Sequence, residues 1–424
     1  MEFRFRKGRD IDLGLAPAST PVVLRAVRSV GLVARDFPGV SFDLRVGEGD
    51  LVRRGQVLCV DRLHPDIAFV AGAAGRISQT RHGARRRIEG IEIATEGDEE
   101  SQFSVEPART DDAALRALLL RSGAWVAFRS RPFGRVPAPA DRPSAIFVTA
   151  TDTNPLAPVP AVVLAPKLDS FRRGAEVLQR LTDGPVFICQ APGPPLAEPG
   201  ERLRVARFSG PHPAGLAGTH IHHLWPVSSQ RSVWQIGYQD VAAIGDLLAV
   251  GRITAERTLS VAGPGVSEPA LVRAPLGSDL RDLLGEKRSD KDTSATRLIS
   301  GSILSGREAR FLGRQDLQVT VLKKREEAVP ARALLWGLLA RLPRAAIGAT
   351  LPSEGFERVF PLDLLPTPLM RALAVGDVET TERLGGLELL EEDLALLSWR
   401  CPSGSDYGAL LRHVLDGLDE ERAA

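Results

Sequence analysis

The sequence predicts an α+β multidomain protein with a β-rich N-terminal domain, an α/β domain, a second β-rich domain and a helical tail. Three observations predict it. The chain has 424 residues, which is more than one compact core usually holds. Short strand-like segments bounded by Gly and Pro fill residues 20–100 and 251–325, and strands alternate with helices between them. Leucine-rich segments with a helical period follow residue 330.

The N-terminal strands carry a repeated half-pattern. Apolar residues alternate along 44–59, with Gly where the chain must turn tightly, and a second half follows at 67–77. This pattern resembles the barrel-sandwich fold of biotinyl and lipoyl carrier domains. Those domains attach their cofactor to a Lys at a hairpin tip, whereas the matching turn here, 61–66, contains no Lys. We therefore expect residues 1–104 to form a barrel-sandwich hybrid domain without a carrier function.

Residues 105–252 are predicted to form a Rossmann-like α/β domain. The first helix, 111–121, has Asp111 and Asp112 in its first turn and Arg121 in its last, as the helix dipole prefers. After it, strands alternate with helices, which is typical of a parallel sheet. The predicted strands are 144–150, 186–189, 203–208 and 233–236, and the predicted helices are 168–181 and 240–250.

The last two domains are assigned by their patterns. Strands at 258–265, 270–273 and 297–301 with a short helix at 280–284 fit a β-grasp (soluble-ligand-binding) domain over residues 253–328. Residues 329–424 form the C-terminal helical domain, with periodic segments at 331–342, 366–375, 391–398 and 408–418. The acidic run Glu391, Glu392 and Asp393 is interpreted as a helix N-terminus, where dipole and solvent favour carboxylates.

Composition excludes several classes of function. The net charge is +1, so nothing global indicates nucleic acid. The basic run 81–87 is local, and we interpret it as a solvated loop between two strands rather than a phosphate-binding patch. The three cysteines, Cys59, Cys189 and Cys401, form no CxxC motif, which favours a reducing compartment over a disulfide framework.

We expect the chain to be cytoplasmic, with any membrane association peripheral. The charged N-terminus lacks the apolar core of a signal peptide. No stretch reaches the ~18 uninterrupted apolar residues of a membrane span. The nearest, 333–347, is broken by Arg341, Pro343 and Arg344.

Motifs for nucleotide chemistry are missing. There is no G-x-G-x-x-G between a strand and a helix, no G-x-x-x-x-G-K-[ST] phosphate loop and no G-x-S-x-G elbow. Four of the seven His lie in 210–223. If this segment were a strand, His220 and His222 would share one face and could suit Zn²⁺ or Fe²⁺. Because no third ligand of matching type lies at the usual spacing, a structural hydrogen-bonding loop containing these residues, His212, His220, His222 and His223, is favoured over a metal site.

An arginine-rich loop, 129–137, lies beside three aromatic residues, Trp125, Phe128 and Phe133. They are either core aromatics next to a surface loop, or an apolar slot with basic rims that would suit a quinone ring. The sequence leaves both interpretations open.

Several segments together resemble one family. Several sequence strings are similar to the large peripheral subunit of the sodium-translocating NADH:quinone reductase. They are 122–125, 129–137, 145–157, 210–222 (GPHPAGLAGTHIH) and 238–241, together with 394–396, 401–402 and 407–408 near the C-terminus. The resemblance extends from Lys7 to Asp416. It implies a peripheral subunit of an oxidoreductase complex that couples NADH oxidation and quinone reduction to Na⁺ export.

The resemblance also implies an architecture related to the NADH-binding flavoprotein subunit of complex I, without its cofactors. In that relative a glycine-rich loop cradles the flavin phosphate, but here Trp125 and Phe128 would fill the space. The relative's tail holds an iron–sulfur cluster through four cysteines, and here only Cys401 remains. The implied subunit has no catalytic, cofactor-binding or metal-binding residues and is not catalytic alone.

The resemblance places the chain on the cytoplasmic side of the bacterial inner membrane. Its partners would be the other members of the complex, especially the multi-span, flavin-bearing membrane subunit. Flavins and iron–sulfur centres would belong to those partners. Ubiquinone would be a substrate, and no nucleic acid is expected.

Two segments are candidates for contact with quinone, because the resemblance links this family to quinone and both segments pair an aromatic residue with rigid prolines and a nearby arginine. The alternatives are a purely structural scaffold of the same complex and, less favoured, a carrier or metal enzyme. Arg131 and Arg135 could also dock the chain onto acidic residues of a membrane partner, with Phe133 as the anchor. The candidate residues are Arg131, Pro132, Phe133, Arg135, Val136 and Pro137 in one segment, and Phe37, Pro38 and Gly39 in the other.

Overall fold

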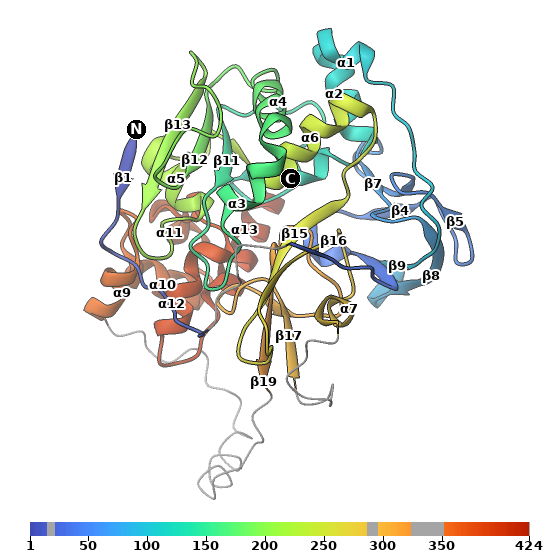
Figure 1. Cartoon of the computed structure of the whole chain (residues 1–424). Helices are drawn as coiled ribbons and strands as arrows, with labels where there is room; N and C mark the ends of the chain where they lie inside the picture. Colours follow the sequence, from blue (N-terminus) through green and yellow to red (C-terminus); the bar gives the residue numbers. More distant parts are fainter. Residues whose placement is uncertain (15–21, 286–295, 324–351, 424) are drawn as a thin grey trace, which may run out of the picture.

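A computed structural model describes residues 1–14, 22–285, 296–323 and 352–423. Two six-stranded sheets, a pair of smaller sheets and a group of C-terminal helices follow one another around the molecule (Figure 1). This arrangement confirms the predicted α+β multidomain class. The predicted helix at 331–342 lies outside the described residues.

The barrel-sandwich domain is built from two small antiparallel sheets. One has the order β3-β9-β8-β5 and the other β4-β6-β7. Phe69 lies at the centre of its core, with ring centroids 4.8 Å from Phe37 and 4.7 Å from Phe42. The hairpin between β6 and β7 carries the predicted turn 61–66. The strands are β3 (Ser29–Val33), β4 (Phe42–Leu44), β5 (Leu51–Val52), β6 (Val57–Asp61), β7 (Ala68–Val70), β8 (Gly75–His82) and β9 (Ile88–Thr95), with 3₁₀ turns η1 (Ala34–Asp36) and η2 (Ala84–Arg86).

Two short strands near the N-terminus extend the two six-stranded sheets instead of the barrel. Strand β1 (Glu2–Arg4) pairs in parallel with β13 of the α/β domain. Strand β2 (Val23–Leu24) pairs in parallel with β16 of the β-grasp domain. The predicted first domain, 1–104, therefore includes two strands that pair elsewhere.

The α/β domain has a sheet of order β1-β13-β12-β11-β14-β10, parallel except for β10. Strand β12 is buried at every residue, as a parallel strand covered on both faces should be. The Asp111 carboxylate caps α2 by accepting from the Ala114 amide. The strands are β10 (Arg129–Arg131), β11 (Ile146–Ala150), β12 (Val186–Gln190), β13 (Leu203–Ser209) and β14 (Val233–Gly237). The helices are α1 (Glu106–Thr110), α2 (Asp112–Arg121), α3 (Pro160–Leu164), α4 (Leu168–Leu178), α5 (Ala217–Leu224) and α6 (Tyr238–Val250), with 3₁₀ turns η3 (Trp125–Ala127) and η4 (Ala165–Lys167).

The β-grasp domain has a mixed sheet of order β18-β17-β19-β15-β16-β2, and a short helix contacts β17. Asp279 caps that helix, α7, by accepting from the Arg281 amide. The elements are β15 (Glu256–Ala262), β16 (Ala270–Pro275), α7 (Leu280–Leu284), β17 (Thr296–Ser300), β18 (Arg307–Glu308) and β19 (Gln318–Lys323).

The C-terminal helices pack around a hydrophobic core of their own, which includes Leu390, Tyr407 and Leu411. The predicted helix 391–398 is divided into a 3₁₀ turn and a short α-helix. The elements are α9 (Glu354–Val359), α10 (Pro366–Val375), α11 (Val378–Arg383), η6 (Gly386–Glu388), η7 (Glu391–Leu394), α12 (Ala395–Arg400) and α13 (Tyr407–Ala423). Among the described residues, no helix is both long and apolar enough to cross a membrane.

Candidate functional site

A cleft of about 1460 Å³ lies where all four domains meet. The strand order β12-β11-β14 reverses the direction of chain progression between β11 and β14, and ligands of open α/β sheets bind at the carboxyl ends of such neighbouring strands. Thr151 and Asp152 follow β11, and Tyr238 follows β14, and all three line the cleft. The barrel contributes η1 and β4, and the C-terminal domain contributes η7 and α13.

Residues from both of the segments predicted to contact quinone line the cleft. Phe37, Pro38, Gly39 and Arg135 all line it. The two segments lie in direct contact there, because a Cβ atom added to Gly39 would lie only 2.8 Å from Arg135 Nη1. Gly39 also has φ +80°, a conformation that favours glycine. About ninety residues separate these segments in the sequence, and only the fold brings them together.

Arg131 does not reach the cleft, although the sequence interpretation gave it a donor role. Its side chain is fully buried. Nη1 donates to Asp393 Oδ2 and to the Glu388 carbonyl, both at 2.6 Å, and Nε donates to Gln235 Oε1 at 2.7 Å. Its donors are therefore used within the chain and do not face a ligand.

Phe133 packs against the C-terminal core instead of lining a groove. Its ring lies against the helical cluster, with the Arg422 guanidinium 5.3 Å from the ring centroid. Its carbonyl accepts from Arg412 Nη1 at 2.6 Å. Arg135 makes ion pairs with Asp416 and Asp419 at 2.9 and 3.0 Å. The acidic residues that this loop docks onto thus belong to the chain's own tail.

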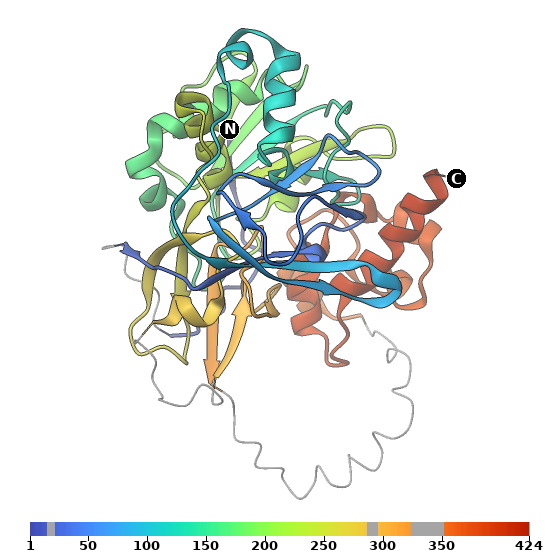
Figure 2. The ribbon, with the colours of Figure 1, turned by 90° about the vertical axis from the view of Figure 1, so that its right-hand side faces the viewer.

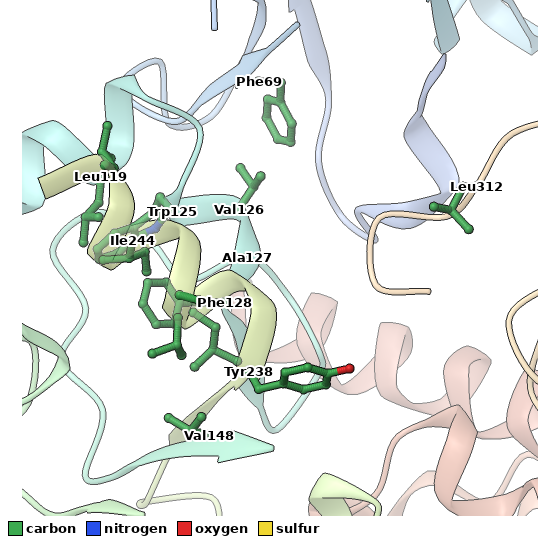
Figure 3. Packing of buried hydrophobic residues seen from close by; sticks show 14 of the residues in the cluster. Phe69, Leu119, Trp125, Val126, Ala127, Phe128, Val148, Tyr238, Ile244 and Leu312 are labelled. Atoms are coloured by element: carbon green, nitrogen blue, oxygen red, sulfur yellow. The ribbon is translucent and has the colours of Figure 1, made fainter. Parts of the chain in front are cut away.

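The remaining loop residues belong to the interior. Pro132 and Pro137 are buried and Val136 is half-buried, and the Pro137 carbonyl accepts from Trp125 Nε1 at 2.8 Å. Trp125 and Phe128 are fully buried. Figure 3 shows both rings beside Ile244 of α6. Of the two interpretations of these aromatics, the structure supports core packing.

Comparisons with known proteins agree across the chain. Family models match residues 3–96 (NqrA N-terminal barrel-sandwich hybrid domain), 110–253 (NqrA second alpha/beta domain) and 258–310 (NQRA C-terminal domain). The NqrA subunit of the Na⁺-translocating NADH-quinone reductase from Marinomonas sp. strain MWYL1 is 40% identical over 99% of this chain and 100% of that protein. The chain belongs to the NqrA family.

Two other relatives with the same name show similar agreement. The Pseudomonas aeruginosa PAO1 protein is 41% identical, and the Yersinia pestis bv. Antiqua protein 38%, each over 99% of both chains. Among solved structures, a chain of an NAD⁺-reducing [NiFe]-hydrogenase aligns at 14% identity and TM-score 0.40, over 74% of this chain and 62% of that one. Structural similarity at this low TM-score supports no further conclusion.

The second half of the histidine string of this NqrA-family chain forms a helix instead of the favoured hydrogen-bonding loop, and the strand that would place His220 and His222 on one face does not form. Residues 217–224 are α5, preceded by a tight loop. Small residues in the string allow close packing of this helix: a Cβ added to Gly218 would lie 2.2 Å from Asp393 Oδ1.

The histidines of the string contact the protein around them. His212 Nδ1 lies 3.2 Å from Thr153 Oγ1, and His220 Nε2 lies 3.0 Å from the Ala214 carbonyl. Burial lowers the pKa of His212 to about 4 and of His220 to about 3. His222 Nδ1 lies 2.8 Å from Glu388 Oε2. Within the described residues, no three His, Cys, Asp or Glu side chains are placed to hold a metal ion.

The acidic run of this NqrA-family chain lies against arginines, and only its last residue, Asp393, is buried from solvent. Asp393 is 5% exposed and pairs with Arg131, and Glu391 pairs with Arg412 at 2.7 Å. Burial raises the pKa of Asp393, and Arg131 opposes that rise without cancelling it. The prediction that solvent favours these carboxylates is therefore wrong for Asp393.

Two buried features were missed from the sequence. Asp240 on α6 accepts from Arg257 Nη2 at 2.6 Å and Arg314 Nη2 at 2.8 Å, and all three side chains are nearly buried. At the cleft, burial raises the pKa of Asp152 to about 6, although the Asn154 amides bond to its carboxylate. No local pattern marks Asp240, because both of its arginine partners come from the β-grasp domain. The partner of Asp152, Asn154, lies only two residues along the chain, but the burial of Asp152 depends on the fold.

Proposed function

We propose that the chain works as the peripheral NqrA component of a sodium-translocating NADH:quinone reductase, on the cytoplasmic side of the bacterial inner membrane. One observation carries this: about 40% identity extends over essentially the whole length of this chain and of its named relatives. In this role it assembles with the other subunits, especially the multi-span, flavin-bearing one in the membrane. NADH oxidation and quinone reduction are then properties of the complex, and the isolated chain has no turnover.

We propose further that the chain holds no redox cofactor, and that flavins and iron–sulfur centres belong to its partners. Two features support this. Trp125 and Phe128 fill the interior beside the first helix of the α/β domain. Cys401 is the only cysteine of the tail, and one thiolate cannot hold a cluster. The test is an absorbance spectrum of the purified chain: stoichiometric flavin or an iron–sulfur band contradicts the proposal.

Ubiquinone contact is proposed at the cleft wall formed by Phe37, Pro38, Gly39 and Arg135. Phe37 stiffens this wall from behind, being 3% exposed and packed on Phe69. Pro38 and Gly39 present a surface that can lie close to a flat ring, because neither has a bulky side chain. Arg135 is 20% exposed. Asp419 and Asp416 accept from its Nε and Nη2, and its Nη1, which lies beside Gly39, is the donor that it offers to a carbonyl that gains charge on reduction. Arg131, Pro132, Phe133, Val136 and Pro137 support this wall without facing the cleft.

The quinone proposal is tested in the assembled complex by titration with a quinone-site inhibitor. Gly39→Ala is expected to weaken inhibitor affinity, since its Cβ needs the space next to Arg135. Phe133→Ala is the matched variant, expected to leave affinity unchanged while loosening the C-terminal helices. The alternative, a purely structural scaffold, predicts normal affinity in both variants once the complex has assembled.

A further inference from the structure

Five arginines on the barrel side of the cleft have no charged partner among the described residues. Their side chains are exposed, and none of these side chains makes a hydrogen bond or ion pair within the part of the chain that the structure describes. They form what we call the arginine rim: Arg35, Arg62, Arg85, Arg86 and Arg87.

The acidic residues of this wall do not neutralise the arginine rim. Asp36 pairs with Arg307, and Asp43 pairs with Arg45. Glu89 is the remaining carboxylate that the barrel brings to the cleft among the described residues. The rim therefore carries a local surplus of positive charge, although the chain as a whole is nearly neutral.

Three members of the rim lie together at the tip of the β8–β9 hairpin. Arg85 and Arg86 have φ 54° and 57°, a left-handed conformation that non-glycine residues rarely adopt. Figure 2 shows this hairpin reaching toward the C-terminal helices. The tip thus holds consecutive arginines over the cleft, where residues of η7 and α13 form the opposite wall.

The same wall contains an open sheet edge. Strand β4 pairs only with β6 within the described residues, and it lines the cleft. The Arg62 amide donates to the Ser41 carbonyl and the Arg45 amide to the Leu58 carbonyl. Because hydrogen-bonding residues alternate along an antiparallel strand, the main-chain groups of Phe42 and Leu44 point away from β6. No second strand pairs with them among the described residues, so this edge can accept another extended chain.

We propose that this cleft receives an extended acidic segment of a partner protein, which adds a strand to the edge of β4 and is held by the arginine rim. The proposal rests on the proposed function, in which the chain works within a complex. Charge complementarity selects an acidic occupant. The open edge favours a peptide over a small phosphate, which cannot use main-chain donors in register. The concave wall also favours a peptide over the flat surface of a lipid bilayer.

The probe is a fluorescein-labelled peptide of alternating Glu and Thr, about ten residues long so that it can span a short strand. It is titrated with the full chain by fluorescence anisotropy. We expect saturable binding at low salt that weakens as NaCl is added. The same peptide, N-methylated at alternate residues to remove the donors facing β4, is expected to bind at least about fivefold more weakly.

Two matched triple variants distinguish binding to the arginine rim from a general effect of removing positive charge. The triple variant R85Q/R86Q/R87Q should weaken peptide binding about tenfold, because it removes three exposed ion pairs that each contribute modestly to affinity. The control R297Q/R358Q/R383Q removes three exposed arginines outside the cleft and should change affinity by less than about twofold.

Four results would overturn the inference. They are no saturable binding at low salt, equal weakening by the two triple variants, full affinity of the N-methylated peptide, and displacement of the peptide by inorganic phosphate or anionic vesicles at matched charge. Co-purification with the membrane components of the complex tests the proposed function separately. If the chain still assembles while the peptide result is negative, this inference fails and the proposed function stands.

Discussion

The Arg131 guanidinium is fully buried and is balanced by a carboxylate from another domain. Asp393 Oδ2 lies 2.6 Å from Nη1, and neither side chain is more than 3% exposed. Buried pairs of this kind add little net stability, but removing one partner leaves an uncompensated charge in the interior. Arg131 therefore joins β10 to the C-terminal helices. Its loss should weaken the contact between the α/β domain and the C-terminal domain.

Arg131→Met is expected to destabilise the chain by about 3–5 kcal/mol, measured as a lower thermal midpoint by calorimetry. The double variant R131M/D393L should recover most of that loss, since it removes both charges. Arg358→Met is the control, because its pair with Glu354 is exposed on both sides and should matter little. A normal midpoint for R131M alone would contradict this account.

Residue types in this loop were visible in the sequence, but their partners were not. The run around Arg131 and Phe133 predicted an arginine-rich loop beside aromatics, which the structure confirms. Whether an arginine faces a ligand or a buried carboxylate depends on residues more than 250 positions away. That information lies in the packing of two domains and has no local pattern.

Helix α5 approaches η7 so closely that one position must be glycine. A Cβ on Gly218 would meet the Asp393 carboxylate at 2.2–2.4 Å, and Arg131 holds that carboxylate in place. The sequence interpretation favoured a hydrogen-bonding loop here, whereas the structure has a helix whose small residues, Ala217 and Gly218, allow the close approach.

Gly218→Ala is expected to destabilise the chain by about 1–3 kcal/mol through overpacking, although alanine is the better helix former. Gly417→Ala in α13 is the matched control, because nothing lies within 4 Å of the added Cβ. It should stabilise by up to about 1 kcal/mol. Opposite signs in the thermal midpoints support the packing argument, and two stabilising substitutions would refute it.

The buried histidines of the same element predict an acid sensitivity. The pKa of His212 falls to about 4 and that of His220 to about 3, mainly through burial. An unfolded chain would bind these protons near pH 6.5. Between pH 6.5 and about 4 the unfolded state therefore holds more protons, so stability falls as the pH falls.

His220→Gln keeps a side-chain donor toward the Ala214 carbonyl and removes one titrating group. The thermal midpoint of the variant should decline less steeply than that of the parent chain between pH 6.5 and 4. His413→Gln is the control, because the His413 side chain is exposed. Parallel pH profiles for the parent chain and H220Q would argue against a neutral, buried His220.

At the scale of the whole molecule, the order of the domains along the chain could be predicted from the sequence. The strand pairings that connect one domain to another could not. Periods of two and of 3.6 residues identified the barrel strands, the α/β alternation and the helical tail. The pairing of Glu2–Arg4 with β13, and of Val23–Leu24 with β16, joins segments about 200 residues or more apart. Short strands of this kind carry little register information of their own, so the sequence could not predict these long-range pairings.

Asp240 is the clearest case of a residue that acts between domains. It lies on α6 of the α/β domain, and it pairs with Arg257 on β15 and Arg314 in the loop before β19. Burial alone would raise the pKa of Asp240, but the two guanidiniums outweigh burial and lower it. Its contribution to stability is therefore complete above the ordinary carboxyl pKa of about 4, and it is lost as the pH falls through the lower folded value.

Asp240→Asn leaves two arginines without a counter-charge in the interior, so we expect a loss of about 3–5 kcal/mol at neutral pH. Because Asp240 and its two arginines connect two domains, calorimetry of the variant should show the unfolding transition of the β-grasp domain separating from that of the α/β domain. Below pH 4 the parent chain loses the same contribution, so the difference between parent and variant should shrink there. Asp183→Asn, at an exposed pair with Arg142, is the control. If D240N unfolds in a single transition at the parent midpoint, the domains are held together by their apolar contacts and this ion cluster is not what couples them.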